Sequence, residues 1–281
     1  MPAGMVWVLL AAGVAGVVVQ PVADMHASPA EDAEVISQAI YGSPLELLAR
    51  KDGWFRVRTE DGYEGWMRAA ALRRLAPGEA PYASRGATAR VASLFANLYY
   101  EPDVTRRAPL ATIPFESRLE IARESEAEQR RWLQVRLPDG RTAWIQRGDL
   151  SSDAAPLGIA ELVEFARRFI GLPYRWGGTS TFGYDCSGFT QMLLRQRRVL
   201  IPRDAAPQMS WSGFIAVDRE NLQPGDLLFF GSSPDKVTHS GMYLGNGEFI
   251  HATTWGRPVV QVSRLDDPHW AQLLVACRRL K

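Results

Sequence analysis

Hydrophobic and polar residues alternate in two stretches of the chain that read almost alike. Both follow the pattern Trp-x-x-Val-Arg-x-x-Asp-Gly-x-x-x-Trp, from Trp54 to Trp66 and again, 78 positions later, from Trp132 to Trp144. Alternation with a period of two predicts a strand, and Asp-Gly favours a hairpin turn because both residues tolerate positive φ. One hairpin cannot cover two indole rings, so each copy is predicted to belong to a small closed β-barrel of about 55 to 65 residues.

The repeats define the first two of three predicted domains. We place one barrel at residues 22–76 and the other at residues 88–150. They are joined by a linker at residues 77–87 that is rich in proline and glycine. Residues 157–281 form the third domain, which the next pattern describes.

The pattern becomes helical after Pro156. Hydrophobic residues from Ile159 to Ile170 recur at helical spacing until Gly171-Leu-Pro173 ends the helix, and a second amphipathic helix is predicted from Cys186. Apolar segments typical of strands follow. The predicted fold class is therefore α+β, with two barrels ahead of a mixed domain.

The N-terminal segment has two interpretations. Residues 5–19 are apolar and uncharged, too short to span a bilayer comfortably, and fit the core of a signal peptide at residues 1–21 that is cleaved near Ala15 or Ala23. No Lys or Arg precedes Arg50, so the positive start of such a signal is missing. In the alternative, Val17 to Met25 form the opening strand of the first barrel. The first interpretation predicts a secreted or cell-envelope protein, and the second a cytoplasmic one.

Composition narrows the class of protein. The chain has 32 Lys and Arg against 31 Asp and Glu, and 46% of its residues are hydrophobic, which argues against disorder and against a nucleic-acid-binding surface. Two cysteines are too few for a disulfide framework or a zinc cage. No Gly-rich phosphate loop or pair of metal ligands appears, so we expect no cofactor, metal, nucleotide or nucleic acid. A monomer is the default expectation.

Cys186 is the predicted nucleophile. It lies at the start of a predicted helix, where unpaired backbone N–H groups and the positive end of the helix dipole favour the thiolate over a free pKa of about 8.5. Cys277, the other cysteine, ends an apolar stretch and is predicted to be a small core residue.

A cysteine nucleophile needs a base, and the chain has four histidines. His239 and His251 lie on either side of Gly245-Asn-Gly247, a sequence typical of a hairpin turn. With a three-residue loop, His251 faces Gly241 across the hairpin, and His239 lies on the same face two residues away. A two-residue loop would move the rings to opposite faces. We therefore predict a three-residue turn and two imidazoles that meet over Gly241.

Five motifs then resemble a known family. They are Tyr174-x-Trp-Gly-Gly, Asp185-Cys-Ser-Gly, Pro-Gly-Asp226-Leu, His239-Ser-Gly-Met-Tyr-Leu-Gly and Ile-His251-Ala. In this order and spacing they resemble the NlpC-type papain-like cell-wall peptidases, over about residues 157–281. The resemblance implies Cys186 as nucleophile, His239 as its base and His251 as the group that orients the base. It also implies that the Tyr174 hydroxyl and the Cys186 backbone N–H stabilise the oxyanion.

The barrels resemble bacterial SH3-like domains that are attached to cell-wall enzymes. Together with the third domain they resemble γ-D-glutamyl-L-diamino acid endopeptidases, which cut peptidoglycan stem peptides after L-Ala-γ-D-Glu. In that subgroup an Arg-Asp-Ser stretch helps to bind the dipeptide, and here Arg203, Asp204 and Ala205 occupy its place without the serine hydroxyl. Arg203 and Asp204 are either part of that site or a surface ion pair. Both diaminopimelate and lysine fit as the diamino acid.

The expected substrate-binding residues come from two domains. Those of the third domain are Asp185, Ser187, Arg203, Asp204 and Trp176, of which Trp176 either packs against the site or fills the core.

In the first barrel, Tyr63 follows the turn at Asp61-Gly62, where the second barrel has Arg141. The difference is either surface divergence or a sign that this barrel alone contributes to the site. In the second case Tyr63, Glu34 and Asp204 bind the free α-amine of L-Ala, and the barrel blocks longer chains.

Three functions fit these observations. The leading one is a cysteine endopeptidase that forms a thioester on Cys186. The others are a wall-binding adaptor with an inert papain-like domain and an acyltransferase. The intact Cys186, His239 and His251 argue against the adaptor, whereas hydrolysis and acyl transfer share the thioester.

Overall fold

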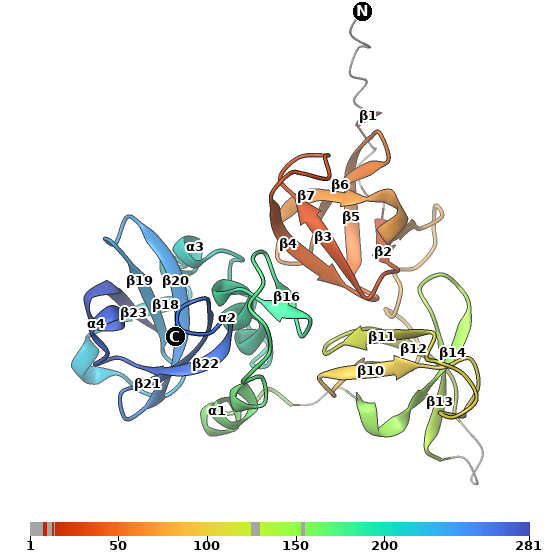
Figure 1. The fold of residues 1–281 in the computed structure, drawn as a ribbon. Coiled ribbons are helices and arrows are strands. Elements are labelled where there is room, and N and C mark those ends of the chain that lie inside the picture. The colour runs from red at the N-terminus through yellow and green to blue at the C-terminus, as the bar shows by residue number, and fades with distance from the viewer. Residues whose placement is uncertain (1–7, 10–12, 14, 125–129, 153–154) are drawn as a thin grey trace, which may run out of the picture. The chain divides into compact units, whose positions relative to one another are not determined.

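The computed structural model describes residues 8–9, 13, 15–124, 130–152 and 155–281, in which the chain forms two compact units, 1–154 and 155–281 (Figure 1). Each unit has its own sheets and its own hydrophobic core. Within the described ranges, no helix is long and apolar enough to cross a membrane.

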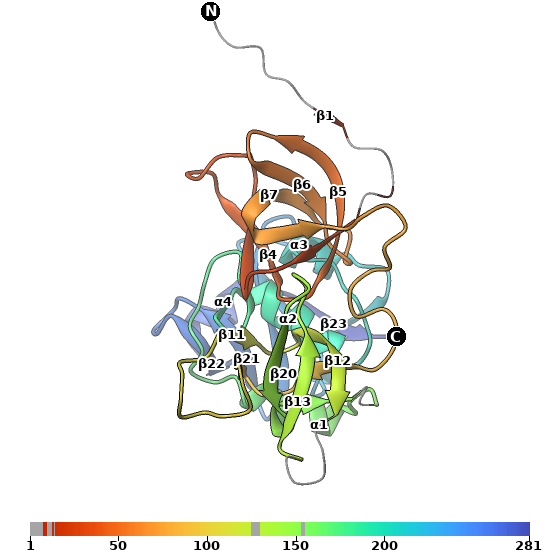
Figure 2. The same cartoon turned by 90° about the vertical axis from the view of Figure 1, so that its right-hand side faces the viewer.

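The N-terminal unit is rich in strands and contains both barrels (Figures 1 and 2). Its elements are β1 (Val8–Leu9), β2 (Ala15–Val18), β3 (Val22–His26), β4 (Val35–Ile40), β5 (Pro44–Lys51), β6 (Trp54–Arg58), β7 (Glu64–Arg68), η1 (Ala69–Ala71), β8 (Leu72–Arg74), β9 (Thr88–Val91), β10 (Phe95–Leu98), β11 (Ala111–Pro114), β12 (Arg118–Glu124), β13 (Trp132–Arg136), β14 (Thr142–Gln146), η3 (Arg147–Asp149) and β15 (Leu150–Ser151). The first sheet has the order β4-β3-β7-β6-β5-β2-β8, with β1 paired to β5. The second barrel contains a sheet of order β14-β13-β12-β9-β15 and the pair β10-β11.

The two repeated hairpins form as predicted. β6 pairs with β7, and β13 pairs with β14, both antiparallel. The turn glycines have positive φ, +79° at Gly62 and +88° at Gly140, which is why glycine follows aspartate in both copies. Trp54 and Trp132 are buried, as expected for a closed barrel.

The first sheet includes a strand upstream of residue 22, where the sequence placed the domain boundary. In β2, Val17 and Val18 are fully buried, and the strand pairs with both β5 and β8. The single strand predicted from Val17 to Met25 is therefore wrong, because the backbone turns between β2 and β3. Cleavage after Ala23 would remove β2 and the start of β3. Most of the apolar run and of the 1–21 segment lies outside the described residues.

The predicted linker, residues 77–87, is held against the second barrel. The Tyr82 hydroxyl donates a hydrogen bond to the Arg136 carbonyl at 2.6 Å, and the Ala83 N–H donates to the Glu120 carboxylate at 3.0 Å. Tyr82 is also buried beside Val17 of β2. The segment thus ties the two barrels together within this unit.

The C-terminal unit is a six-stranded antiparallel sheet with helices on both faces (Figure 1). Its elements are α1 (Ile159–Arg167), β16 (Thr179–Ser180), β17 (Gly183–Tyr184), α2 (Cys186–Arg195), α3 (Ala205–Met209), β18 (Phe214–Val217), η4 (Arg219–Asn221), β19 (Leu227–Gly231), β20 (Val237–Gly245), β21 (Glu248–Thr253), β22 (Val259–Arg264), α4 (Pro268–Leu273) and β23 (Leu274–Leu280). The sheet order is β18-β23-β19-β20-β21-β22. Helix α1 ends three residues before the predicted Ile170, which lies in a turn.

Two faces of this sheet carry different contacts. On one face, the hydroxyl oxygen of Thr190 in α2 lies 3.3 Å from the hydroxyl oxygen of Ser240 in β20. On the other, Trp270 of α4 packs with Phe230 and Phe249. Cys277 is buried in the same apolar cluster, as predicted.

Candidate active site

Cys186 is the first residue of α2, as the sequence predicts. Asp185 caps the helix, because its carboxylate accepts the Gly188 N–H at 2.7 Å. The backbone N–H groups of Ser240 and Ser187 are directed at the buried thiol. The nucleophile is thus held between the first turn of α2 and strand β20.

The expected thiolate is wrong for the resting protein. Burial raises the pKa of the Cys186 thiol to about 11, and the charge of Asp185 adds to the shift. The two N–H groups and Arg203 act in the opposite direction but less strongly. Removal from water therefore outweighs the helix terminus, and Cys186 is a neutral thiol near pH 7.

The motif glycines explain how α2 reaches its place. A Cβ on Gly188 would lie 2.2 Å from the Gly178 carbonyl oxygen, and one on Gly178 would lie 2.3 Å from that of Gly183. The Asp185 N–H donates to the Gly178 carbonyl at 3.1 Å. The Trp-Gly-Gly backbone therefore touches the first turn of the helix, an approach that a side chain would prevent.

His239 and His251 meet as predicted. His239 Nε2 lies 2.6 Å from His251 Nδ1, and the ring centroids are 4.9 Å apart. The imidazoles lie on the face of the sheet that α4 covers: Trp270 stacks on His239, with centroids 5.1 Å apart, and meets His251 edge-on at 4.7 Å. Trp270, which the sequence analysis did not identify as part of the site, thus packs against both rings.

The predicted three-residue turn is wrong. Asn246 and Gly247 form a two-residue turn with φ of +53° and +78°, and Gly245 pairs with Glu248. Both turn residues lie in the left-handed region that short hairpins prefer. By the argument from the sequence, this turn should have placed the imidazoles on opposite faces.

A β-bulge beside Tyr243 explains why they share a face. The bulge adds one residue to β20 and shifts the register, so that Met242 pairs with Ile250. Gly241 then lies next to His251, and a Cβ on Gly241 would be 3.2 Å from the His251 Cβ. The extra residue in the strand compensates for the residue missing from the turn.

Ser263 of β22 extends the pair into a chain of polar atoms. Its Oγ lies 3.0 Å from His251 Nε2. If Ser263 accepts from His251 Nε2–H, His251 Nδ1 accepts from His239 Nε2–H, and His239 Nδ1 keeps its lone pair. The arrangement can therefore leave one specific nitrogen of His239, Nδ1, free to accept a proton.

Burial also controls the charge of the two histidines. It lowers the pKa of His239 to about 3, with a smaller contribution from His269. It lowers the pKa of His251 well below the usual value, helped by His239 and His269. Both rings are neutral at pH 7, so His239 can act as a base.

Cys186 and His239 are both described, and no hydrogen bond joins them. The thiol instead receives the N–H of Ser240, the residue next to His239. Catalytic hydrogen bonds often form or tighten only when substrate binds, so this geometry is compatible with a nucleophile and base on adjacent elements.

Tyr174 lies within the electrostatic reach of the nucleophile. Burial raises the pKa of its phenol, and the charges of Cys186 and Asp185 raise it further. The hydroxyl therefore stays protonated and can donate a hydrogen bond to a developing negative charge.

Asp185, Ser187 and Arg203 form a buried network. Arg203 contacts Asp185 through two hydrogen bonds of 3.0 and 2.6 Å and donates to the Ser187 hydroxyl at 3.0 Å. The Arg203 side chain is 1% exposed, so the alternative of a surface ion pair is wrong. The network holds the start of α2, and its predicted contact with substrate stays a prediction.

The remaining predicted residues are more dispersed. Asp204 precedes α3, and Ala205 is buried in its first turn. Trp176 is 61% exposed, so of its two interpretations the one in which it fills the core is wrong. Tyr63 is partly buried against the first-barrel core, whereas Glu34 is exposed. Both belong to the N-terminal unit, and their role at Cys186 stays a prediction.

Among the described residues, no group of three or more His, Cys, Asp or Glu side chains could hold a metal ion.

Known proteins resemble this chain in both its domains and its sequence. Residues 171–279 match the NlpC/P60 family, and residues 25–72 match the bacterial dipeptidyl-peptidase SH3 domain. A γ-D-glutamyl-L-lysine dipeptidyl-peptidase of Bacillus cereus is 33% identical over 258 residues, which cover 86% of this chain and 74% of the relative. Dipeptidyl-peptidase 6 of Lysinibacillus sphaericus is 29% identical over 90% of this chain and 92% of its own. The crystal structure of a Bacillus cereus NlpC/P60 family protein, 26% identical, covers 95% of this chain and 99% of its own with a TM-score of 0.81.

Proposed function

Because the chain belongs to the NlpC/P60 family of cysteine peptidases, we propose that it hydrolyses the bond between γ-D-glutamate and the following L-diamino acid in peptidoglycan stem peptides. The observation that carries the proposal is the position of the Cys186 thiol against β20, where it receives the N–H of Ser240, the residue next to His239 of the His239–His251 pair. The name of the Bacillus cereus relative, a γ-D-glutamyl-L-lysine dipeptidyl-peptidase, supports the choice of bond. Lysine and diaminopimelate both remain candidate diamino acids.

The first half of the proposed reaction forms a thioester. His239 Nδ1 removes the thiol proton as Cys186 Sγ attacks the γ-carbonyl carbon of D-glutamate. Because the thiol and the imidazole are both neutral at rest, proton transfer accompanies the attack instead of preceding it. The imidazolium then gives its proton to the nitrogen of the diamino acid, the C–N bond breaks and the amine leaves.

The second half returns the enzyme to its starting state. His239 removes a proton from water, whose oxygen attacks the thioester carbon. The C–S bond breaks, the thiolate recovers the proton from His239, and L-Ala-γ-D-Glu is released as an acid. In both halves the Tyr174 hydroxyl and the Cys186 N–H stabilise the oxyanion, since an N–H in the first turn of a helix has no partner within the helix.

The test of this function uses defined stem peptides and mass analysis of the products. We expect the parent chain to release L-Ala-γ-D-Glu. Cys186→Ala should release it at less than about a hundredth of the parent rate, because removal of the nucleophile abolishes the covalent route. Cys277→Ser is the matched control and should retain activity. Cleavage at another bond, or full activity of Cys186→Ala, would overturn the proposal. Incorporation of an added amine into the product would indicate acyl transfer.

The proposal extends to a requirement for a free N-terminal L-Ala, bound by Tyr63, Glu34 and Asp204. A site built for an ammonium group rejects a capped one, because acetylation removes the charge and the donors that its partners would bind. We expect acetylation of the substrate amine to abolish cleavage, and Tyr63→Ala to weaken cleavage of the free peptide. Tyr100→Ala, which removes an exposed tyrosine of the second barrel, is the control. Equal cleavage of free and acetylated peptides would refute this part of the proposal.

A further inference from the structure

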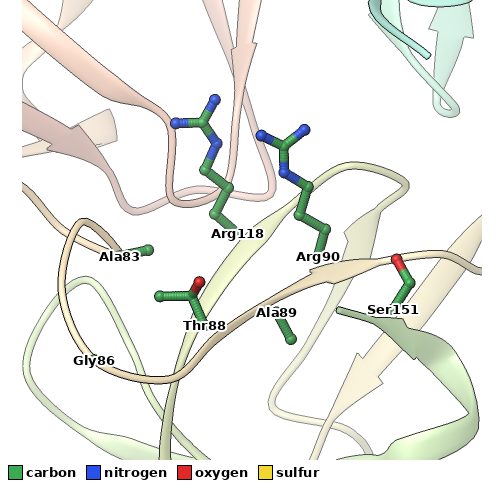
Figure 3. Close-up of a pocket in the computed structure, with 7 residues that line it drawn as sticks. All are labelled: Ala83, Gly86, Thr88, Ala89, Arg90, Arg118 and Ser151. Atoms are coloured by element: carbon green, nitrogen blue, oxygen red, sulfur yellow. The ribbon is translucent and has the colours of Figure 1, made fainter. Parts of the chain in front are cut away.

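A polar pocket of about 380 Å³ lies on the N-terminal unit, where the linker meets the second barrel (Figure 3). Its lining includes the side chains of Thr88, Arg90, Arg118 and Ser151. The volume is within the range of small-molecule sites in proteins. None of these residues has a place in the reaction described above.

Two arginines lie side by side at this pocket. Arg90 of β9 and Arg118 of β12 are direct partners in the antiparallel ladder, and Figure 3 shows both side chains extending in the same direction from neighbouring strands. Like charges in directly opposed positions destabilise a sheet. Their juxtaposition is therefore unfavourable unless negative charge lies between or beside them.

The protein supplies that charge to one arginine and not to the other. Arg118 donates two hydrogen bonds to the Glu60 carboxylate, at 3.0 and 2.5 Å. Arg90 is exposed, and its guanidinium has no ion-pair partner among the residues that the structure describes. Glu120, two residues beyond Arg118 on β12, is already bonded to the Ala83 N–H at 3.0 Å. Arg90 is thus the uncompensated cation of the pocket.

We propose that this pocket binds an oxyanion, a carboxylate or a phosphate group, with Arg90 as its principal ligand. A guanidinium matches the planar fork of a carboxylate and the edge of a phosphate through paired N–H donors. Thr88 and Ser151 add hydroxyl donors on the same lining. The site would hold anionic material apart from the reaction centre, whether a stem peptide with several carboxylates or a phosphate-bearing polymer supplies the group.

Titration calorimetry on the full chain tests the proposal. The chain carries Cys186→Ala, so that no turnover occurs, and the probes are inorganic phosphate and an N-acetylated stem tetrapeptide at low ionic strength. We expect saturable binding of at least one probe and a loss of at least tenfold in affinity in Arg90→Gln. Arg90→Lys should fall between, because an ammonium keeps the charge but loses the paired donors.

Arg107→Gln is the matched control, because it removes the same charge from an exposed position in the same barrel, where Arg107 lies over Tyr100. It should leave the affinity unchanged. Equal weakening by Arg90→Gln and Arg107→Gln would reduce the effect to net charge and overturn the proposal, as would binding that neither substitution changes or no saturable binding of either probe.

Binding of phosphate alone, or of the tetrapeptide alone, supports the site and identifies the source of the anion. Cleavage of free stem peptides by Arg90→Gln in a Cys186 background is measured separately and should match the parent rate. A failure of the anion site is thereby distinguished from a failure of the proposed hydrolysis.

Discussion

A neutral thiol beside neutral imidazoles reacts with electrophiles differently from a preformed thiolate. The pKa of Cys186 is raised to about 11 and that of His239 is lowered to about 3, both mainly by burial. We expect iodoacetamide to label Cys186 slowly at pH 7 and faster as the pH approaches 11, because the reactive thiolate accumulates only there. The rate is measured by peptide mass analysis in Cys277→Ser, since that second thiol also has a pKa raised to about 11. A labelling rate already maximal at pH 6 would contradict the expectation.

Ser263 is expected to act on the rate through His251. Without a hydroxyl to accept from His251 Nε2–H, the ring can adopt the other tautomer, which no longer accepts from His239. A hydrogen bond of this kind contributes about 0.5 to 1.5 kcal/mol, which corresponds to at most roughly tenfold in rate. Ser263→Ala should therefore lower kcat by about tenfold with little change in KM, whereas Ser263→Thr, which keeps the hydroxyl, should be close to the parent. Equal kcat values for Ser263→Ala and the parent would exclude a role of Ser263 in positioning His251.

The difference between Cys186 and Ser263 shows what the sequence reveals at this scale. Cys186, His239 and His251 lie in motifs whose residue types and spacing indicate nucleophilic chemistry. Ser263 and Trp270 reach the same site from β22 and α4, and no local pattern links them to it. The charge state of Cys186 was predicted wrongly because burial, which decides it, depends on segments distant in the sequence.

At the level of secondary structure, α2 begins at a buried ion pair. Arg203→Met should lower the free energy of unfolding by about 3 kcal/mol, because it leaves the Asp185 carboxylate buried without its partner. The double variant Arg203→Met, Asp185→Asn should recover part of that loss, since no buried charge is then left unpaired. Urea unfolding measures both.

Arg257→Met provides the matched control for this experiment. Arg257 is exposed in the turn between β21 and β22, and its replacement should change stability by less than about 0.5 kcal/mol. If Arg203→Met were as stable as Arg257→Met, the ion pair would have no stabilising role at the start of α2.

The elements with a clear period were predictable, and irregularities within strands were not. The Asp-Gly hairpins and the start of α2 follow from local residue types. The break between β2 and β3 had a signal in Pro21, which lacks the N–H that a central strand needs. The bulge beside Tyr243 has no comparable signal, because it depends on packing across the sheet.

For the whole molecule, the buried histidines predict a specific loss of stability in acid. An unfolded His has a pKa of about 6.5, whereas that of folded His239 is about 3, so the unfolded chain binds more protons between these values. Stability therefore falls as the pH decreases from about 6.5 towards 3. Between pH 7 and pH 5 the expected loss is about 1 to 2 kcal/mol for His239.

Hydrogen exchange of the β20 and β21 amides at pH 7 and pH 5 measures this loss in the full chain. The variant His239→Gln has no imidazole at position 239. The protection of its β20 and β21 amides should therefore decrease less over the same pH interval. Parallel behaviour of the parent and His239→Gln would attribute the acid sensitivity to other groups. The second barrel provides an internal reference, since residues 88–150 contain no histidine.

The order of domains was also visible in the sequence, because the repeat and the change to helical spacing divide the chain. The contribution of Tyr63 and Glu34 to the catalytic site depends on how an exposed surface is used, which residue periodicity does not encode.

The number of residues between His239 and the bulge in β20 decides whether the two imidazoles meet. A single residue inserted into β20 between Gly241 and Tyr243 would shift the pairing of His239 by one residue and turn its imidazole to the opposite face of the sheet. Such an insertion replaces no functional side chain. In this hairpin, a gene lengthened by one codon would therefore encode a protein whose general base no longer meets its partner.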